Sequence, residues 1–159
     1  MDITKDLYST SINIAAKDLI INSIKITLQI WILGNNIDFR LTMPLFGRGS
    51  SGGIFMYDIT DYSSLRSIKD WLNAFRQGLL EDKRTIPIIM IGGKSDLHES
   101  RVVSQDKAKR IAQEHKLLKY YECSSKTDEN IDKIFTFMTR AILKSEGYLI
   151  QRSNFKLRL

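Results

Sequence analysis

Two short polar runs hold the residues whose types and spacing suit a binding site. The first is Gly92-Gly93-Lys94-Ser95-Asp96-Leu97 and the second is Glu122-Cys123-Ser124-Ser125-Lys126-Thr127. An aspartate and a lysine stem from one loop, with backbone amides from another, can hold a purine base. The pair of runs therefore looks like the base-facing half of a guanine-recognition site.

A nucleoside triphosphate also needs a dense array of phosphate donors. The glycine-rich loop that cradles phosphates, Gly-x-x-x-x-Gly-Lys-Ser/Thr, occurs nowhere in the sequence. The sequence thus predicts a site whose phosphate-binding half is missing. The alternative is ordinary loop chemistry, in which Asp96 caps a turn and Ser124 caps the last helix.

Apolar periodicity predicts the strands that would position these runs. Two β-rich stretches, 18–21 and 24–31, flank Asn22-Ser23 and predict a hairpin. Short apolar runs predict buried strands at 53–58, 85–91 and 119–123. The segment 32–51, rich in glycine and asparagine, is expected to be a long functional loop with a short helix.

Three amphipathic helices are expected between and after the buried strands. The first is capped by Asp61 or Ser63, the second is capped by Ser104, and the third begins at Ile131. Strands that alternate with helices predict an α/β fold over residues 1–150, with a mostly parallel sheet flanked by helices and entered through one antiparallel hairpin. Residues 151–159 are expected to form a basic tail.

Ligands in such a fold bind at the carboxyl ends of the parallel strands. Both polar runs follow predicted strands, so we expect them to lie together at that edge of the sheet. Cys123, the single cysteine, excludes an intramolecular disulfide and indicates a reducing, cytoplasmic setting. No cysteine lies near the C-terminus, so no prenyl anchor is expected.

The composition is typical of a globular protein, with 43% apolar and 26% charged residues among 159. A net charge of +6 at pH 7 would favour contact with nucleic acid. However, lysine and arginine are interspersed with acids along amphipathic helices, which is typical of a solvated surface. We therefore expect no nucleic-acid partner.

Over nearly all of residues 8–146, the sequence resembles the small GTPases of the Ras superfamily, most closely the Rab branch. Seven motifs carry the resemblance in the order and spacing of that family. They are Leu28-Gln-Ile-Trp31, Phe39-Arg40, Tyr57-Asp-Ile-Thr-Asp61, Ile68-Lys-Asp-Trp-Leu72, Lys94-Ser-Asp-Leu97, Arg101-Val-Val-Ser104 and Glu122-x-Ser-x-Lys-Thr127.

The resemblance implies roles for residues on the base-facing side. Asp96 matches the aspartate that accepts hydrogen bonds from guanine N1 and N2, and Lys94 matches the lysine whose stem packs on the base and sugar. Ser124 and Ser125 fall in the loop whose backbone N–H faces guanine O6, and Lys126 covers the purine. The asparagine that precedes the lysine in the family is Gly93 here.

On the phosphate side, the sequence departs from the family. We expect the first strand, the glycine-rich loop and the helix after it to be missing. Ser11 aligns with the threonine that joins Mg²⁺ and the γ-phosphate. The family pattern Asp-x-x-Gly-Gln is replaced by Ile32-Leu-Gly-Asn-Asn36, so the acid is lost and Asn36 stands at the position of the catalytic glutamine.

In the family, the first strand lies between the strand that ends at Trp31 and the strand that ends at Asp58. Its absence leaves two strands with open edges, and open edges recruit other strands. The two strands could pair directly, residues 1–7 could fill the gap, or another chain could do so. We expect a rearranged sheet or one completed in a homo-oligomer.

These departures predict a Rab-like pseudo-GTPase with weak or no binding of GTP or GDP, doubtful Mg²⁺ binding and no efficient GTP hydrolysis. It would act in vesicle trafficking as an interaction module, through the switch-like region 32–51 and the helix 62–78, and would reach membranes through a partner. The alternative is a GTP-binding switch whose natural chain is longer or whose phosphate site is completed otherwise. Truncation does not explain the altered segment 32–36, which lies inside the chain.

Overall fold

The computed structural model describes residues 12–34, 37–81 and 83–148. Strands and helices alternate along most of this length. In chain order they are β1 (Ile12–Ile21), β2 (Ile24–Leu33), α1 (Ile37–Gly47), β3 (Gly53–Asp58), α2 (Tyr62–Arg66), α3 (Ile68–Glu81), β4 (Ile88–Gly93), the 3₁₀ helix η2 (Ser95–Ser100), α4 (Gln105–Glu114), β5 (Lys119–Glu122) and α5 (Ile131–Ser145).

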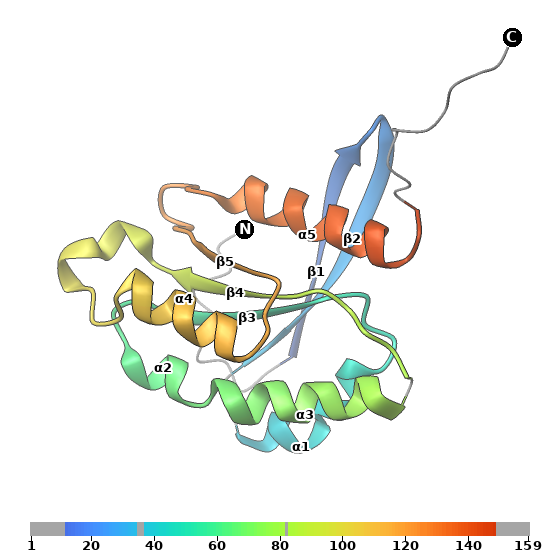
Figure 1. The fold of residues 1–159 in the computed structure, drawn as a ribbon. Coiled ribbons are helices and arrows are strands. Elements are labelled where there is room, and N and C mark those ends of the chain that lie inside the picture. The colour runs from blue at the N-terminus through green and yellow to red at the C-terminus, as the bar shows by residue number, and fades with distance from the viewer. Residues whose placement is uncertain (1–11, 35–36, 82, 149–159) are drawn as a thin grey trace, which may run out of the picture.

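A three-stranded parallel sheet in the order β3-β4-β5 forms the centre of the molecule. Helix α5 covers one face of this sheet, and α2, α3 and α4 cover the other (Figure 1). Side chains of β4 alternate between the two cores: Ile88 and Met90 pack toward α2–α4, whereas Ile89 and Ile91 pack toward α5. The α/β fold with a parallel sheet flanked by helices, predicted from the sequence, is confirmed.

All three predicted helix starts agree with the structure, and α5 begins at Ile131 as expected. The carboxylate of Asp61 accepts a hydrogen bond from the N–H of Ser63 and caps α2, and the hydroxyl of Ser104 accepts one from the N–H of Lys107 and caps α4. The helix expected over 62–78 is divided at Ser67 into α2 and α3. None of the described helices is long and apolar enough to cross a membrane.

The predicted hairpin is present and longer than expected, because β1 begins at Ile12. Strands β1 and β2 pair antiparallel from Ile12↔Leu33 to Ile21↔Ile24 and form a sheet of their own. Within the described ranges neither strand pairs with β3. Direct pairing of the strand ending at Trp31 with the strand ending at Asp58, one of three expected arrangements, is therefore not the one observed.

The hairpin contacts the rest of the molecule through two helices. The ammonium of Lys17 lies 3.0 Å from the carboxylate of Asp132 and 5.3 Å from the ring centroid of Phe135, both on α5. On the other side, the rings of Trp31 and Phe46 lie 5.9 Å apart and join β2 to α1. Trp31 remains 50% exposed.

The segment 32–51 is mostly regular structure, and its interpretation as a long loop was wrong. Ile32 and Leu33 extend β2, and α1 covers residues 37–47 even though Pro44 lies inside it. Proline and glycine disfavour helix when only local propensity is counted. Helix α1 packs along α3 (Figure 1), and this packing outweighs the propensity. Met43 of α1 is buried.

The turn of the hairpin holds two residues in the left-handed region, Asn22 at φ +52° and Ser23 at φ +67°. Asn-Gly is the preferred pair in such turns, because a side chain in this region costs about 1 kcal/mol or more. We expect Ser23→Gly to raise the free energy of unfolding by about 0.5–1 kcal/mol in urea denaturation. Ser23→Ala is the control, and equal stability of the two variants would contradict the proposed cause.

Candidate functional site

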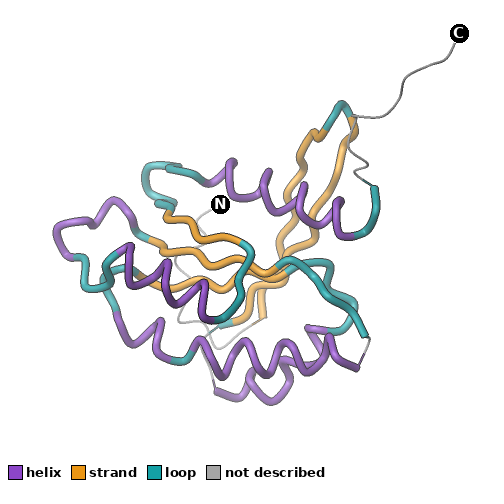
Figure 2. Tube along the Cα trace, in the orientation of Figure 1, coloured by secondary structure: helices purple, strands orange, loops and turns teal. Residues whose placement is uncertain are grey.

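The two polar runs lie at the same carboxyl edge of the central sheet. Lys94 follows β4 with φ +63°, and η2, which carries Asp96, begins directly after it. The N–H of Ser95 donates to the carbonyl of Cys123 (3.0 Å), and the N–H of Cys123 donates to the carbonyl of Gly92 (2.9 Å). Figure 2 shows η2 and the loop that precedes α5 at one end of the sheet. Backbone pairing thus joins the two runs as expected from the strand order.

A short hydrogen bond joins Asp96 to Ser124. The hydroxyl of Ser124, which is fully buried, donates to Oδ1 of Asp96 at 2.5 Å. The hydroxyl oxygen of Ser124 in turn accepts hydrogen bonds from the N–H groups of Lys126 (3.2 Å) and Thr127 (3.3 Å). A hydroxyl carries one donor and two acceptor positions, so all three are used. Ser124 therefore orients the carboxylate of Asp96 and the backbone of the second loop together.

The alternative interpretation of Ser124 as the cap of the last helix was wrong. Helix α5 is capped by Asn130 at φ +60°, and the amide of Asn130 donates to the carbonyl of Glu122 at 2.9 Å. A second serine–carboxylate bond runs in the opposite direction between the loops, from the hydroxyl of Ser95 to the carboxylate of Glu129 at 2.5 Å. The two loops are thus braced from both sides.

Lys94 points its ammonium toward the end of β3. Its Nζ lies 2.6 Å from Oδ2 of Asp58, a residue only 5% exposed. The other carboxylate oxygen of Asp58 accepts the N–H (2.8 Å) and the hydroxyl (2.7 Å) of Thr60. The carboxylate therefore has a cation and two hydrogen-bond donors within the chain itself.

The environment of Asp58 lowers the pKa of its carboxyl below the ordinary value of 3.8. Burial alone would raise this pKa, but the bond from Lys94 and the two donors of Thr60 together outweigh burial. Asp58 is consequently ionised at neutral pH, and its charge is balanced chiefly by Lys94.

The side chain of Met56 on β3 lies close to Gly93. A Cβ atom added at Gly93 would lie 2.7 Å from Cε of Met56, well inside van der Waals contact. A larger residue at this position would require the flexible end of Met56 to move. The hydrogen bond from Ser95 to Glu129 joins the two loops through residues other than Gly93.

Four predicted site residues remain: two lie in the loop after β5, and two lie outside the described residues. Ser125 is partly buried and the side chain of Lys126 is exposed, both in the loop after β5. Ser11 and Asn36, named from the sequence for the metal and for the glutamine position, lie outside the described residues. The structure therefore brings together Lys94, Asp96 and the Ser124–Ser125–Lys126 loop at one edge.

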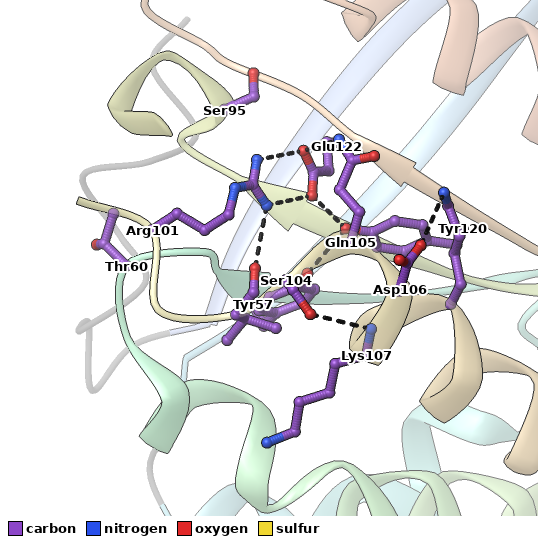
Figure 3. Close-up of polar contacts among 12 residues, drawn as sticks. Tyr57, Thr60, Ser95, Arg101, Ser104, Gln105, Asp106, Lys107, Tyr120 and Glu122 are labelled. Atoms are coloured by element: carbon purple, nitrogen blue, oxygen red, sulfur yellow. Dashed lines mark hydrogen bonds and ion pairs between the residues drawn. The ribbon is translucent and has the colours of Figure 1, made fainter. Parts of the chain in front are cut away.

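A network of hydrogen bonds surrounds the carboxylate of Glu122, the last residue of β5 (Figure 3). The guanidinium of Arg101 donates two bonds of 2.7 Å to the Glu122 carboxylate, one to each oxygen. Gln105 donates at 2.9 Å and the hydroxyl of Tyr120 at 2.5 Å. The hydroxyl of Tyr120 also lies 3.0 Å from that of Tyr57. The network ties β5 to α4 and β3 directly beneath the two loops.

Burial and hydrogen bonding shift the pKa values of Glu122, Tyr120 and the neighbouring Cys123. Burial would raise the pKa of Glu122, but the bonds from Arg101, Tyr120 and Gln105 together lower it below the ordinary 4.5. Burial, followed by the bond to the Glu122 carboxylate, raises the pKa of Tyr120. Burial also raises the pKa of the Cys123 thiol to about 11, so this cysteine is neutral and packs at the end of the strand.

The sequence did not identify Asp58 or Arg101 as partners of the site residues. Asp58 is the last residue of β3, at the edge where ligands bind in such sheets, which was a signal that its side chain could reach the next loop. Arg101 is separated from Glu122 by a helix, so no local spacing indicates their bond. Pairings of this kind depend on the register of the sheet.

Comparison with known proteins identifies the family. The family model described as "Ras family" matches residues 2–144. The chain is a member of the Ras family. It is 35% identical over 137 residues to Ras-related protein Rab-1 of Theileria parva, covering 86% of this chain and 60% of that protein.

Other relatives of this Ras-family chain are also Rab proteins. Ras-related protein Rab-13 of Rattus norvegicus is 30% identical over 123 residues, covering 77% of this chain and 59% of the relative. Ras-related protein Rab-2B of Dictyostelium discoideum is 33% identical over 137 residues, covering 86% and 66%. The chain is therefore Rab-like, and it spans about three fifths of the length of the relatives.

Membership of the Ras family implies a relation to proteins that bind GTP or GDP with Mg²⁺. The base-facing edge fits guanine in its chemistry, because the carboxylate of Asp96 keeps acceptor capacity beyond the single bond from Ser124. In the part of the chain that the structure describes, no three His, Cys, Asp or Glu side chains are grouped to hold a metal ion.

The lowered pKa of Glu122 makes the stability of the fold sensitive to acid. The unfolded chain takes up a proton near the ordinary 4.5, before the folded chain does, so this stabilisation is complete above pH 4.5 and is lost as pH falls through the lowered folded value. We expect Glu122→Gln to cost about 2 kcal/mol of unfolding free energy at pH 7 and to reduce the further loss on acidification.

Urea unfolding at a series of pH values measures both effects. Glu114→Gln, at an exposed position on α4, is the matched control and should follow the unsubstituted protein. If Glu122→Gln lost as much stability in acid as the unsubstituted protein, Glu122 would not be a source of the acid sensitivity.

Proposed function

We propose that this Rab-like chain is a pseudo-GTPase interaction module, with weak or no guanine-nucleotide binding and no efficient GTP hydrolysis. The observation that carries the proposal is the 2.6 Å contact between Lys94 and Asp58. The ammonium that would reach a bound nucleotide is held by a buried carboxylate of the same chain. A ligand that took Lys94 away would leave Asp58 without its cation, at a cost of about 1.5–3 kcal/mol.

The base-facing edge alone supplies little affinity. Asp96 offers acceptors to a base, but phosphate groups contribute charge-assisted bonds of about 1.5–3 kcal/mol each when an array of donors surrounds them. Ile32, at the position of the family's magnesium-linked acid, is an apolar residue paired with Asn13 in the β1–β2 ladder. The arrangement supports a surface that keeps the geometry of a base site without the chemistry of phosphate binding.

The proposed interaction surface consists of region 32–51 and helices α2 and α3. Leu41 and Leu45 on α1 are 87% and 64% exposed, and Trp31 on the adjoining strand is 50% exposed. Exposed apolar side chains that lie close together commonly mark contacts with proteins. We propose protein partners at this surface, a cytoplasmic location, peripheral attachment to membranes through such a partner, and a role in vesicle trafficking.

A GTP-binding switch is the second candidate function. The intact bond between Ser124 and Asp96 favours it, because this bond prepares the carboxylate for a base. The chain also spans only about three fifths of the length of the Rab relatives, so a longer natural chain could supply a phosphate site. Upstream coding sequence containing a glycine-rich loop would support this function.

Calorimetric titration with GTP, GDP and ATP, each with and without Mg²⁺, tests the proposal. We expect dissociation constants weaker than about 0.1 mM for all three, corresponding to less than about 5.5 kcal/mol of binding free energy. Micromolar or tighter binding of GTP would contradict the pseudo-GTPase and favour the switch.

Two variants locate any residual binding. Asp96→Asn removes the acceptor pair for guanine N1 and N2, and should abolish a weak GDP signal. Asp128→Asn makes the same change of charge at an exposed position of the neighbouring loop and should preserve that signal. Equal loss in both variants would mean that the signal reflects charge and not the base-facing edge.

A further inference from the structure

Helices α1 and α3 approach each other so closely that only glycine fits at their contact. A Cβ atom at Gly78, in the third turn of α3, would lie 2.0 Å from the carbonyl oxygen of Pro44. A Cβ atom at Gly47, the last residue of α1, would lie 2.4 Å from the carbonyl oxygen of Phe75. Both obstacles are backbone atoms, which cannot turn aside as a flexible side chain can.

Glycine inside a helix weakens the helix, because it loses more conformational freedom on folding than alanine does. Gly78 is nevertheless buried within α3. Its place is explained by the contact with α1, where the two backbones pack with no side chain between them. The helix propensity of α3 is thus lowered at the residue where α1 crosses it.

Charged side chains hold α1 on either side of this glycine contact. The guanidinium of Arg40 lies 3.1 Å from the carboxylate of Asp70 and 5.6 Å from the ring centroid of Trp71. Arg48, just after α1, forms an ion pair with Glu81 at the end of α3. The two ion pairs lie at opposite ends of the contact, so they oppose both sliding and rotation of α1.

The connection at the end of α1 is fixed as well. The N–H of Arg48 donates to the carbonyl of Pro44 at 3.1 Å, and the N–H of Ser50 donates to that of Gly47 at 3.3 Å. Gly49 takes φ +67°, as is typical where a helix ends. The ring of Phe46 meanwhile contacts Trp31 of the hairpin. Helix α1 is consequently tied to α3, to β2 and to its own C-terminal turn.

We propose that α1 is locked onto α3 as a permanent part of the fold, so that the face carrying Leu41 and Leu45 has one conformation whether or not a nucleotide is present. The lock consists of the Gly47–Gly78 contact together with the Arg40–Asp70 and Arg48–Glu81 ion pairs. A segment held by backbone contact cannot shift slightly: it is either docked or released. The inference is independent of the nucleotide affinity proposed above, because it rests only on contacts within the chain.

Hydrogen exchange of the α1 amides in the full chain tests the lock through Gly78→Ala. Helix propensity alone predicts that alanine strengthens α3, whereas the lock predicts that it displaces α1. We expect α1 amides to be protected in the unsubstituted protein and to exchange at least tenfold faster in Gly78→Ala, with α5 amides unchanged. The control, Gln77→Ala at the adjacent exposed position, should leave α1 protection unchanged.

Unchanged or slower exchange of α1 in Gly78→Ala would overturn the lock, as would rapid exchange of α1 in the unsubstituted protein. If Gly78→Ala fails to fold, the pair Asp70→Asn and Glu81→Gln removes both ion pairs and keeps both glycines. That double variant should raise α1 exchange several-fold, and no change would overturn the lock.

A second measurement separates the lock from the proposed function. Exchange of α1 should be the same with no nucleotide, with 5 mM GDP·Mg²⁺ and with 5 mM GTP·Mg²⁺. A difference between the two nucleotides would overturn the lock. Tight nucleotide binding by calorimetry without any change in α1 exchange would contradict the pseudo-GTPase while leaving the lock intact.

Discussion

A buried carboxylate must keep a cation beside it, and Lys94 fills that requirement for Asp58. Removing the cation from a nearly enclosed carboxylate is strongly unfavourable, because neither water nor another charge compensates for it. The lysine that leads the base-facing loop is therefore part of the support of β3 and of the turn at Thr60. A ligand that bound the ammonium of Lys94 would have to take it from Asp58.

The rest of the edge keeps its shape because its polar residues stabilise the fold. Ser124 holds Asp96 and two backbone amides, Ser95 reaches Glu129, and Glu122 gathers donors from α4 and β5. The bonds of Ser124 and Glu122 satisfy side chains that are buried in the fold. These contacts within the chain hold the geometry of the edge without a ligand. Beside it, α1 packs closely on α3 at Gly47 and Gly78.

The sequence predicted the elements that depend on local pattern, and missed those that depend on contacts across the sheet. Apolar periodicity and capping residues were enough for the parallel strands, the hairpin and the helices begun by Asp61 and Ser104. They failed for α1, since Pro44 and Gly47 disfavour a helix until α3 is placed against them. They likewise could not pair Lys94 with Asp58, because that contact requires β3 and β4 to be neighbours in register.

A double-mutant cycle on Asp58 and Lys94 measures their coupling most directly. Unfolding free energies of Asp58→Asn, Lys94→Gln and the double variant, with and without 5 mM GTP·Mg²⁺, give the energy of the pair. We predict a coupling of about 1–2 kcal/mol that is unchanged by the nucleotide. A coupling near zero, or one that disappears when GTP·Mg²⁺ is added, would show that Lys94 is available to a ligand. Either result would contradict the claim that Asp58 holds the ammonium of Lys94.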